Sequence, residues 1–149
     1  MVFALVNFLR AASVLVFALG CAAILLRAQT ATSVWDGIYS DAQATRGEAA
    51  YSKDCASCHG AKLQGRSQAP PLSGAEFTMN WNGASVAELF DKMQSSMPAD
   101  QPGRLSPLQN AEILAYLLKA NQFPAGPREL EGDSAKLRPV RFEAAKPKL

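Results

Sequence analysis

Apolar and polar positions recur with helical spacing in the middle of the chain. Four apolar residues fall on one face of a predicted helix: Val86, Leu89, Phe90 and Met93. Directly before them, Ser85 and Glu88 have the spacing of a capping box, in which a serine and a glutamate three residues later satisfy the first free N–H groups. The pattern therefore predicts an amphipathic helix that begins at residue 86.

A second helix is predicted from residue 107 onward. Ser106 and Gln109 again have capping-box spacing, and Pro107 takes the first helical position, where its missing N–H costs nothing. The apolar residues that follow surround the helix almost completely: Ile113, Leu114, Tyr116, Leu117 and Leu118. We expect a helix of this kind to be deeply packed.

Thr45 and Glu48 form a third such pair, which predicts a helix over residues 46–54. Residues 60–83 are rich in Gly and Pro and are expected to form a loop. No segment alternates apolar and polar residues well enough to predict a strand. The expected fold class is all-α with long loops, and a core of roughly 80 residues with so much loop would bury little apolar surface unaided.

The chain divides into four stretches. Residues 1–28 carry a positive charge at Arg10, then an uninterrupted apolar run and small residues, which is the pattern of a secretory signal peptide. An uncleaved membrane anchor is the alternative, and only then would the protein contact a membrane. Residues 29–40 form a polar lead-in, 41–121 the core domain, and 122–149 an extension with too many prolines for a helix. The signal predicts a location in the periplasm.

Charge narrows the range of partners. Arg10 and Arg27 fall within the signal, so the mature chain keeps 13 of the 15 basic residues against 13 acidic ones. A formally neutral protein gives no indication of nucleic-acid binding. The extension is slightly basic and has apolar residues that we expect to pack down in part, a disordered extension being the alternative: Phe123, Leu130, Leu137, Val140 and Phe142.

Cys55-Ala56-Ser57-Cys58-His59 is the attachment signature of c-type haem. Each thiol forms a thioether with one porphyrin vinyl group, and His59 binds the iron. One covalent haem would then supply the apolar core that the loop-rich chain lacks.

The alternative readings of the motif do not account for this core. A redox dithiol needs a strand–helix setting, a structural zinc needs four ligands, and a disulfide between Cys55 and Cys58 would leave the core unexplained.

Over most of residues 45–121 the chain resembles class I cytochromes c. Gly47 and Tyr51 match the first helix of that family, where the glycine permits close approach of the last helix and the aromatic packs beside it. Ile113 and Tyr116 match the partner positions on that closing helix. The resemblance implies a fold of three to five helices with long loops around the haem. It also implies that a proline carbonyl, assigned here to Pro71 rather than Pro70, accepts the proton of the iron-binding histidine.

The sixth iron ligand is expected to be a methionine, because His59 is the sole histidine. Met79, Met93 and Met97 are the candidates, and Met93 has the spacing of a core residue. Met97 precedes Pro98 in a segment that resembles the axial-ligand loop of the family, so Met97 is the predicted ligand.

Aromatic residues complete the predicted haem site. Phe77 and Trp81 are expected to form the pocket wall, with the indole N–H of Trp81 available to a haem propionate. Trp35 and Tyr39 precede the core, where they either cover a haem edge or hold the lead-in in place. The sequence does not decide between these two roles.

A haem with His and Met ligands has no open position, so the expected function is one-electron transfer rather than catalysis. The expected partners are redox proteins, with a dehydrogenase as donor and a cytochrome or oxidase as acceptor. The segment around Met97 resembles cytochromes associated with quinoprotein dehydrogenases, which leaves a permanently docked subunit open. A haem enzyme or gas sensor with a vacant sixth site is the other alternative.

Overall fold

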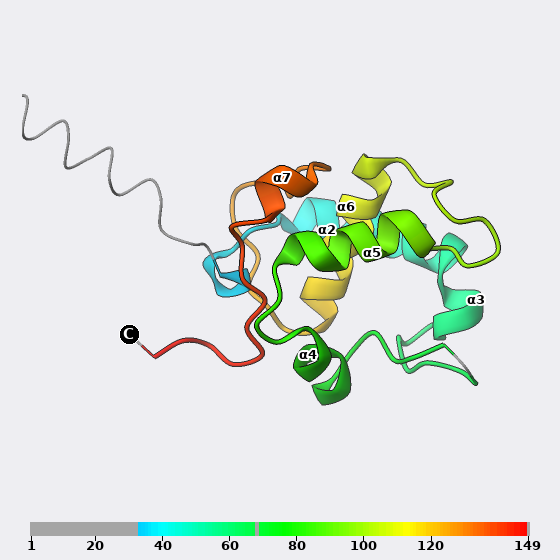
Figure 1. Cartoon of the computed structure of the whole chain (residues 1–149), viewed down its shortest axis with the longest axis horizontal. Coiled ribbons are helices and arrows are strands. Elements are labelled where there is room, and N and C mark those ends of the chain that lie inside the picture. The colour runs from blue at the N-terminus through cyan, green and yellow to red at the C-terminus, as the bar shows by residue number, and fades with distance from the viewer. Residues whose placement is uncertain (1–32, 68, 149) are drawn as a thin grey trace, which may run out of the picture. The chain divides into compact units, whose positions relative to one another are not determined.

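The structure is a computed structural model that describes residues 33–67 and 69–148. The predicted signal segment, residues 1–28, lies outside them. The helices are η2 (Val34–Asp36, a 3₁₀ turn), α2 (Asp41–Asp54), α3 (Ala56–His59), α4 (Ala75–Trp81), α5 (Val86–Ser96), α6 (Pro107–Ala120) and α7 (Ser134–Leu137). Over the described ranges there is no strand, only isolated β-bridges. The predicted all-α fold class is confirmed (Figure 1).

Two of the predicted helix starts are confirmed. In α5 the Glu88 carboxylate accepts from the Ser85 N–H at 2.9 Å, and the Ser85 hydroxyl accepts from the Glu88 N–H at 3.3 Å. In α6 the same exchange joins Ser106 and Gln109, at 2.9 and 3.2 Å. Each pair satisfies two N–H groups that the helix itself leaves free.

Among the described helices, none is long and apolar enough to cross a membrane.

The predicted start of the first long helix was wrong. Helix α2 begins at Asp41, and the Ser40 hydroxyl caps it by accepting from the Gln43 N–H at 3.1 Å. Thr45 therefore lies inside the helix, where its hydroxyl donates to the Asp41 carbonyl at 3.0 Å. Ser40 is as good an N-cap as Thr45, and the earlier start adds a full turn of hydrogen bonds.

Helices α2 and α6 cross closely, as the family resemblance implies. A Cβ at Gly47 would overlap the carbonyl oxygen of Glu112, so a residue without a side chain is required there. One turn further on, the rings of Tyr51 and Tyr116 lie 5.3 Å apart, and Ile113 is buried beside them. This crossing holds the first and last helices of the core together.

Helix α4 lies within the region that was predicted to be loop. Phe77 and Trp81 are four residues apart and therefore share a face of this helix, and Phe77 is buried. That spacing is the signal that could have revealed α4. The described residues contain six α-helices rather than three to five, because α3 and α7 are single turns of four residues.

The C-terminal extension packs onto the core, which confirms the expectation for its apolar residues: Phe123, Leu130, Leu137, Val140 and Phe142 are all buried. Phe123 and Phe142 stack edge-on at 5.2 Å, and Trp35 of the lead-in lies 4.9 Å from Phe123. Backbone bridges join Arg141 to both Ser33 and Ser85. The extension therefore ties the lead-in to the start of α5.

The lead-in and the extension also cross at a pair of glycines. A Cβ at Gly126 would overlap the backbone of Gly37, so the lead-in and the extension approach each other as closely as two backbone segments can. Next to this crossing the Tyr39 hydroxyl donates to the Phe123 carbonyl at 2.6 Å. The Gly126 N–H in turn donates to the Tyr39 carbonyl at 2.7 Å.

Candidate functional site

The two cysteines of the motif lie on one helical turn. Cys55 ends α2 and precedes α3, and its carbonyl accepts from the N–H groups of Cys58 at 3.1 Å and His59 at 2.9 Å. Both thiols are free, with Cys55 half-buried and Cys58 exposed. The turn thus presents two thiols and an imidazole from five consecutive residues, by means of backbone hydrogen bonds alone.

His59 is buried and oriented by the loop that follows it. Its Nδ1 lies 2.9 Å from the carbonyl oxygen of Pro70. A carbonyl only accepts, so Nδ1 carries the proton and Nε2 keeps the free lone pair. The predicted acceptor, Pro71, was wrong by one residue, because neighbouring carbonyls of an extended segment point in different directions and only that of Pro70 faces the imidazole.

Residues 60–67 and 69–72 form a tight loop next to His59, where the Gly65 N–H donates to the His59 carbonyl at 2.8 Å. The Leu72 N–H donates to the Leu63 carbonyl at 2.9 Å, which sets the register of the two prolines before it. Gly65 has φ +75, and a Cβ there would lie 2.8 Å from Pro71 N, so glycine permits both the turn and the close approach. From α2, the Tyr51 hydroxyl donates to the Gly60 carbonyl at 2.7 Å.

Burial dominates the electrostatics of the attachment turn. It raises the pKa of the Cys55 thiol to about 11, with the nearby Asp54 charge acting in the same direction and Arg104 against it. Burial likewise raises the pKa of Tyr51 to about 12. Before haem attachment, Cys55 is therefore a protonated thiol at neutral pH.

The three candidate methionines have different surroundings. Met93 is 9% exposed and belongs to the apolar core on α5, as its spacing predicts. Met79 is 63% exposed on α4. Met97 is half-buried and caps the C-terminus of α5, where the backbone turns to an extended conformation after its N–H has bonded the Met93 carbonyl at 3.0 Å.

The aromatic residues separate into two groups. Trp81 is half-buried at the end of α4 and packs against the apolar core; its predicted role toward a propionate stays a prediction. Trp35 and Tyr39 face the extension instead. The Trp35 indole N–H donates to the Glu143 carbonyl at 2.9 Å, so these two residues hold the lead-in in place.

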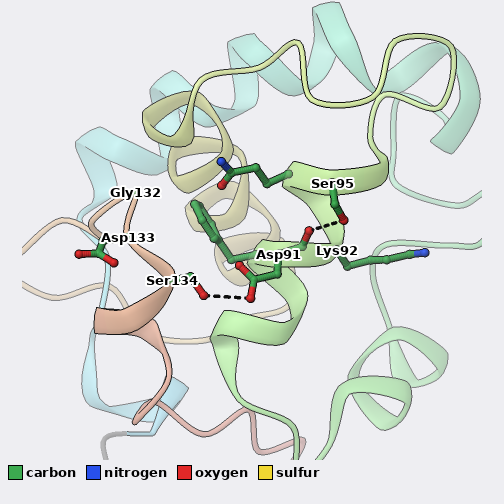
Figure 2. Close-up of a pocket in the computed structure, with 8 residues that line it drawn as sticks. Asp91, Lys92, Ser95, Gly132, Asp133 and Ser134 are labelled. Atoms are coloured by element: carbon green, nitrogen blue, oxygen red, sulfur yellow. Dashed lines mark hydrogen bonds between the residues drawn. The ribbon is translucent and has the colours of Figure 1, made fainter.

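The structure also has an open groove between α5 and residues 132–134, and neither cysteine lines it (Figure 2). Its walls are joined where the Ser134 hydroxyl donates to Asp91 at 2.9 Å. No residue predicted to contact the haem lines this groove. It is a feature of how the extension packs.

The residues of the attachment turn fit haem c. The two free thiols lie three residues apart on one turn, and the histidine directly after them has the tautomer that leaves Nε2 to a metal. Cys55 and Cys58 would hold the porphyrin, and His59 would bind the iron. When bound, the haem supplies an iron that gains or loses one electron. Fold and site together define a c-type cytochrome.

Comparison with known families agrees with that class. Residues 42–117 match the family described as cytochrome C oxidase, cbb3-type, subunit III, and this match covers just over half of the chain. The chain belongs to this family of c-type cytochrome domains, and its cofactor is covalently attached haem c.

A solved structure with a similar fold is the sulfane dehydrogenase SoxCD from Paracoccus pantotrophus. The sequences are 21% identical, with a TM-score of 0.50. The similarity covers 72% of this chain but only 61% of the other, so this chain spans less than two thirds of it. At this identity the likeness supports the fold alone. No curated protein sequence matches the chain.

Proposed function

We propose that this protein is a one-electron carrier in which His59 and Met97 would both bind the haem iron. The observation that carries the proposal is the position of Met97, half-buried at the point where α5 ends and the chain becomes extended. A methionine that binds a cofactor must have a side chain that is free to leave the protein core. Met93 is fixed in the core, and Met79 is mostly exposed to solvent.

Ligation of this kind favours transfer over catalysis. A thioether opposite an imidazole stabilises ferrous iron and raises its reduction potential relative to two histidines. With His59 and Met97 both bound, the iron would have no free position at which a small molecule could react. The chain then acts as a carrier and not as an enzyme.

The proposed location of the protein and its proposed redox partners rest on the signal pattern and on the similar proteins. The signal pattern of residues 1–28 supports export, so we propose that the carrier is in the periplasm. The similar solved structure is described as a dehydrogenase and the matching family as an oxidase subunit. These descriptions support a dehydrogenase as electron donor and an oxidase or a second cytochrome as acceptor.

Optical spectroscopy tests the proposal. The full chain is expressed with a c-type haem maturation system, and ferric and ferrous spectra are recorded with and without carbon monoxide. We expect a haem that resists extraction by acidified solvent, a methionine–iron charge-transfer band in the ferric state, and no carbon monoxide adduct. A high-spin haem that binds carbon monoxide readily would contradict the carrier and favour an enzyme or a gas sensor.

A further inference from the structure

An ion pair with one buried member lies beside the haem-attachment turn. Asp54 is the last residue of α2, directly before Cys55, and Arg104 Nη2 lies 2.6 Å from its Oδ1. The Asp54 side chain is only 5% exposed, whereas that of Arg104 is 36% exposed. A carboxylate this deeply buried depends on its partner, because removing the partner leaves an uncompensated charge.

Arg104 belongs to the loop that starts at Met97. This loop, residues 97–106, runs from the end of α5 to the start of α6 and lies at the same end of the molecule as α3 (Figure 1). Two short backbone turns shape it, in which the Gln101 N–H donates to the Pro98 carbonyl at 3.0 Å and the Arg104 N–H to the Gln101 carbonyl at 3.4 Å.

The middle of the loop has few other attachments. Residues 99–104 are all exposed, and the chain is buried again only at Leu105. Within the part of the chain that the structure describes, Arg104 is the member of 99–104 whose side chain bonds to another element. A loop with so few buried contacts opens locally at low free energy unless something ties it down.

We propose that the ion pair between Asp54 and Arg104 ties the Met97 loop to the haem-attachment turn and so keeps Met97 on the iron. Asp54 and Arg104 are then positioning residues for the sixth ligand, and the inference rests on the proposed ligation by Met97. The two anchors of the haem, the cysteine turn and the methionine loop, are held in register by one ion pair. Without it, the loop opens more often and the sixth position is vacant for a larger fraction of the time.

Binding of imidazole to the ferric holoprotein measures that fraction. An external ligand can bind only when Met97 has left, so its apparent affinity scales with the population of the open state. We expect Asp54→Asn and Arg104→Gln to bind imidazole about ten- to a hundredfold more tightly than the wild type, which is less than a fully buried pair would give because Arg104 is partly exposed to solvent. The methionine–iron band should weaken in both variants while the haem stays attached.

Two further variants separate the tie from general stability. Arg46→Gln breaks the ion pairs of Arg46 with Glu112 at 2.6 Å and with Glu129 at 2.8 Å, which join α2 to α6 and to the extension. Neither pair involves the Met97 loop, so the imidazole affinity of this variant should stay at the wild-type value. Arg104→Lys keeps the charge and should restore most of the lost band intensity. Asp54→Asn also guards against misfolding, because it leaves the solvent-accessible Arg104 without a partner rather than a buried carboxylate.

The outcomes distinguish the two proposals. The wild type could show the methionine–iron band while the Asp54 and Arg104 variants bind imidazole no more tightly than Arg46→Gln. The proposed role of the ion pair would then be wrong, and the proposed carrier function would be unaffected. If the wild type lacks the band, the proposed ligation by Met97 is wrong, and so is the role of the ion pair in holding Met97. Tighter binding in both pair variants, with recovery in Arg104→Lys, supports the tie.

Discussion

The side chain of Gln43 pairs with the backbone of Leu130 in both directions. Its Nε2 donates to the Leu130 carbonyl at 2.8 Å, and its Oε1 accepts from the Leu130 N–H at 2.8 Å. Gln43 is completely buried, so a primary amide on α2 satisfies both polar groups of one residue in the C-terminal extension. This contact attaches the extension to the first turn of α2 through a side chain.

Replacing Gln43 by alanine should therefore destabilise the protein strongly. The Leu130 N–H and carbonyl would both lose their partner in a buried place, which costs about 2–4 kcal/mol in free energy of unfolding. Denaturant titration of the holoprotein measures the loss. Gln94→Ala on α5 is the matched control and should cost much less; equal midpoints for the two variants would contradict this role of Gln43.

Phe142 should be as important as a residue of the central core. It is completely buried and stacks on Phe123 and Phe77, whose rings lie 5.2 and 6.0 Å away. Phe142→Ala should cost about 3–5 kcal/mol, because a large aromatic side chain is lost from a packed cluster. Thermal unfolding measures the change against Lys146→Ala, an exposed substitution near the same end, which should stay within about 0.5 kcal/mol of the wild type.

The two methionines near the end of α5 should respond differently to truncation. Met97→Ala should leave the haem attached, abolish the methionine–iron band and allow carbon monoxide to bind the ferrous protein. Met93→Ala should keep the band and cost about 2–5 kcal/mol of stability, because Met93 fills the core. Spectra and unfolding curves of both variants decide the matter: an open site in Met93→Ala but not in Met97→Ala would reverse the assignment.

Alkaline pH should weaken the fold in a defined window. Burial raises the pKa of Tyr39 and of Tyr51 from 10 to about 12. Between these values the folded protein keeps phenol protons that the unfolded chain releases, so stability falls as the pH rises from about 10 and levels off above about 12. Denaturant midpoints measured across this range test the expectation.

A double variant, Tyr39→Phe with Tyr51→Phe, provides the control for this window. Both hydroxyls donate to backbone carbonyls, at 2.6 Å to Phe123 and 2.7 Å to Gly60, so the variant should be less stable at neutral pH. Its stability should depend less on pH between 10 and 12. A phenolate absorbance that titrates fully near pH 10 in the folded wild type would show that these residues are not protected.

Local signals in the sequence were sufficient to predict two helix starts and the haem-attachment motif. The caps at Ser85 and Ser106 depend on groups three residues apart, and the haem motif on five consecutive residues, so each can be recognised without knowledge of the fold. The close approach at Gly47 was predicted through the family resemblance, because a side chain there meets the backbone of another helix.

The remaining features depend on residues that are distant in sequence. The choice of Pro70 over Pro71 is set by the pairing of Leu63 with Leu72, which fixes the direction of each carbonyl. The partner of Gln43 lies 87 residues away, and nothing in composition or periodicity indicates such a contact. Where two good caps compete, as at the start of α2, the sequence alone also fails to decide.

The bridge between Ser33 and Arg141 has a consequence for the order in which the protein is made. The indole N–H of Trp35 donates to the carbonyl of Glu143, 108 residues later, so the lead-in can dock only when the extension is present. The turn at Cys55 needs only hydrogen bonds across three or four residues and can form at once. We therefore expect thioether formation to precede closure, with the maturation machinery acting on a polypeptide whose lead-in and extension have not yet met.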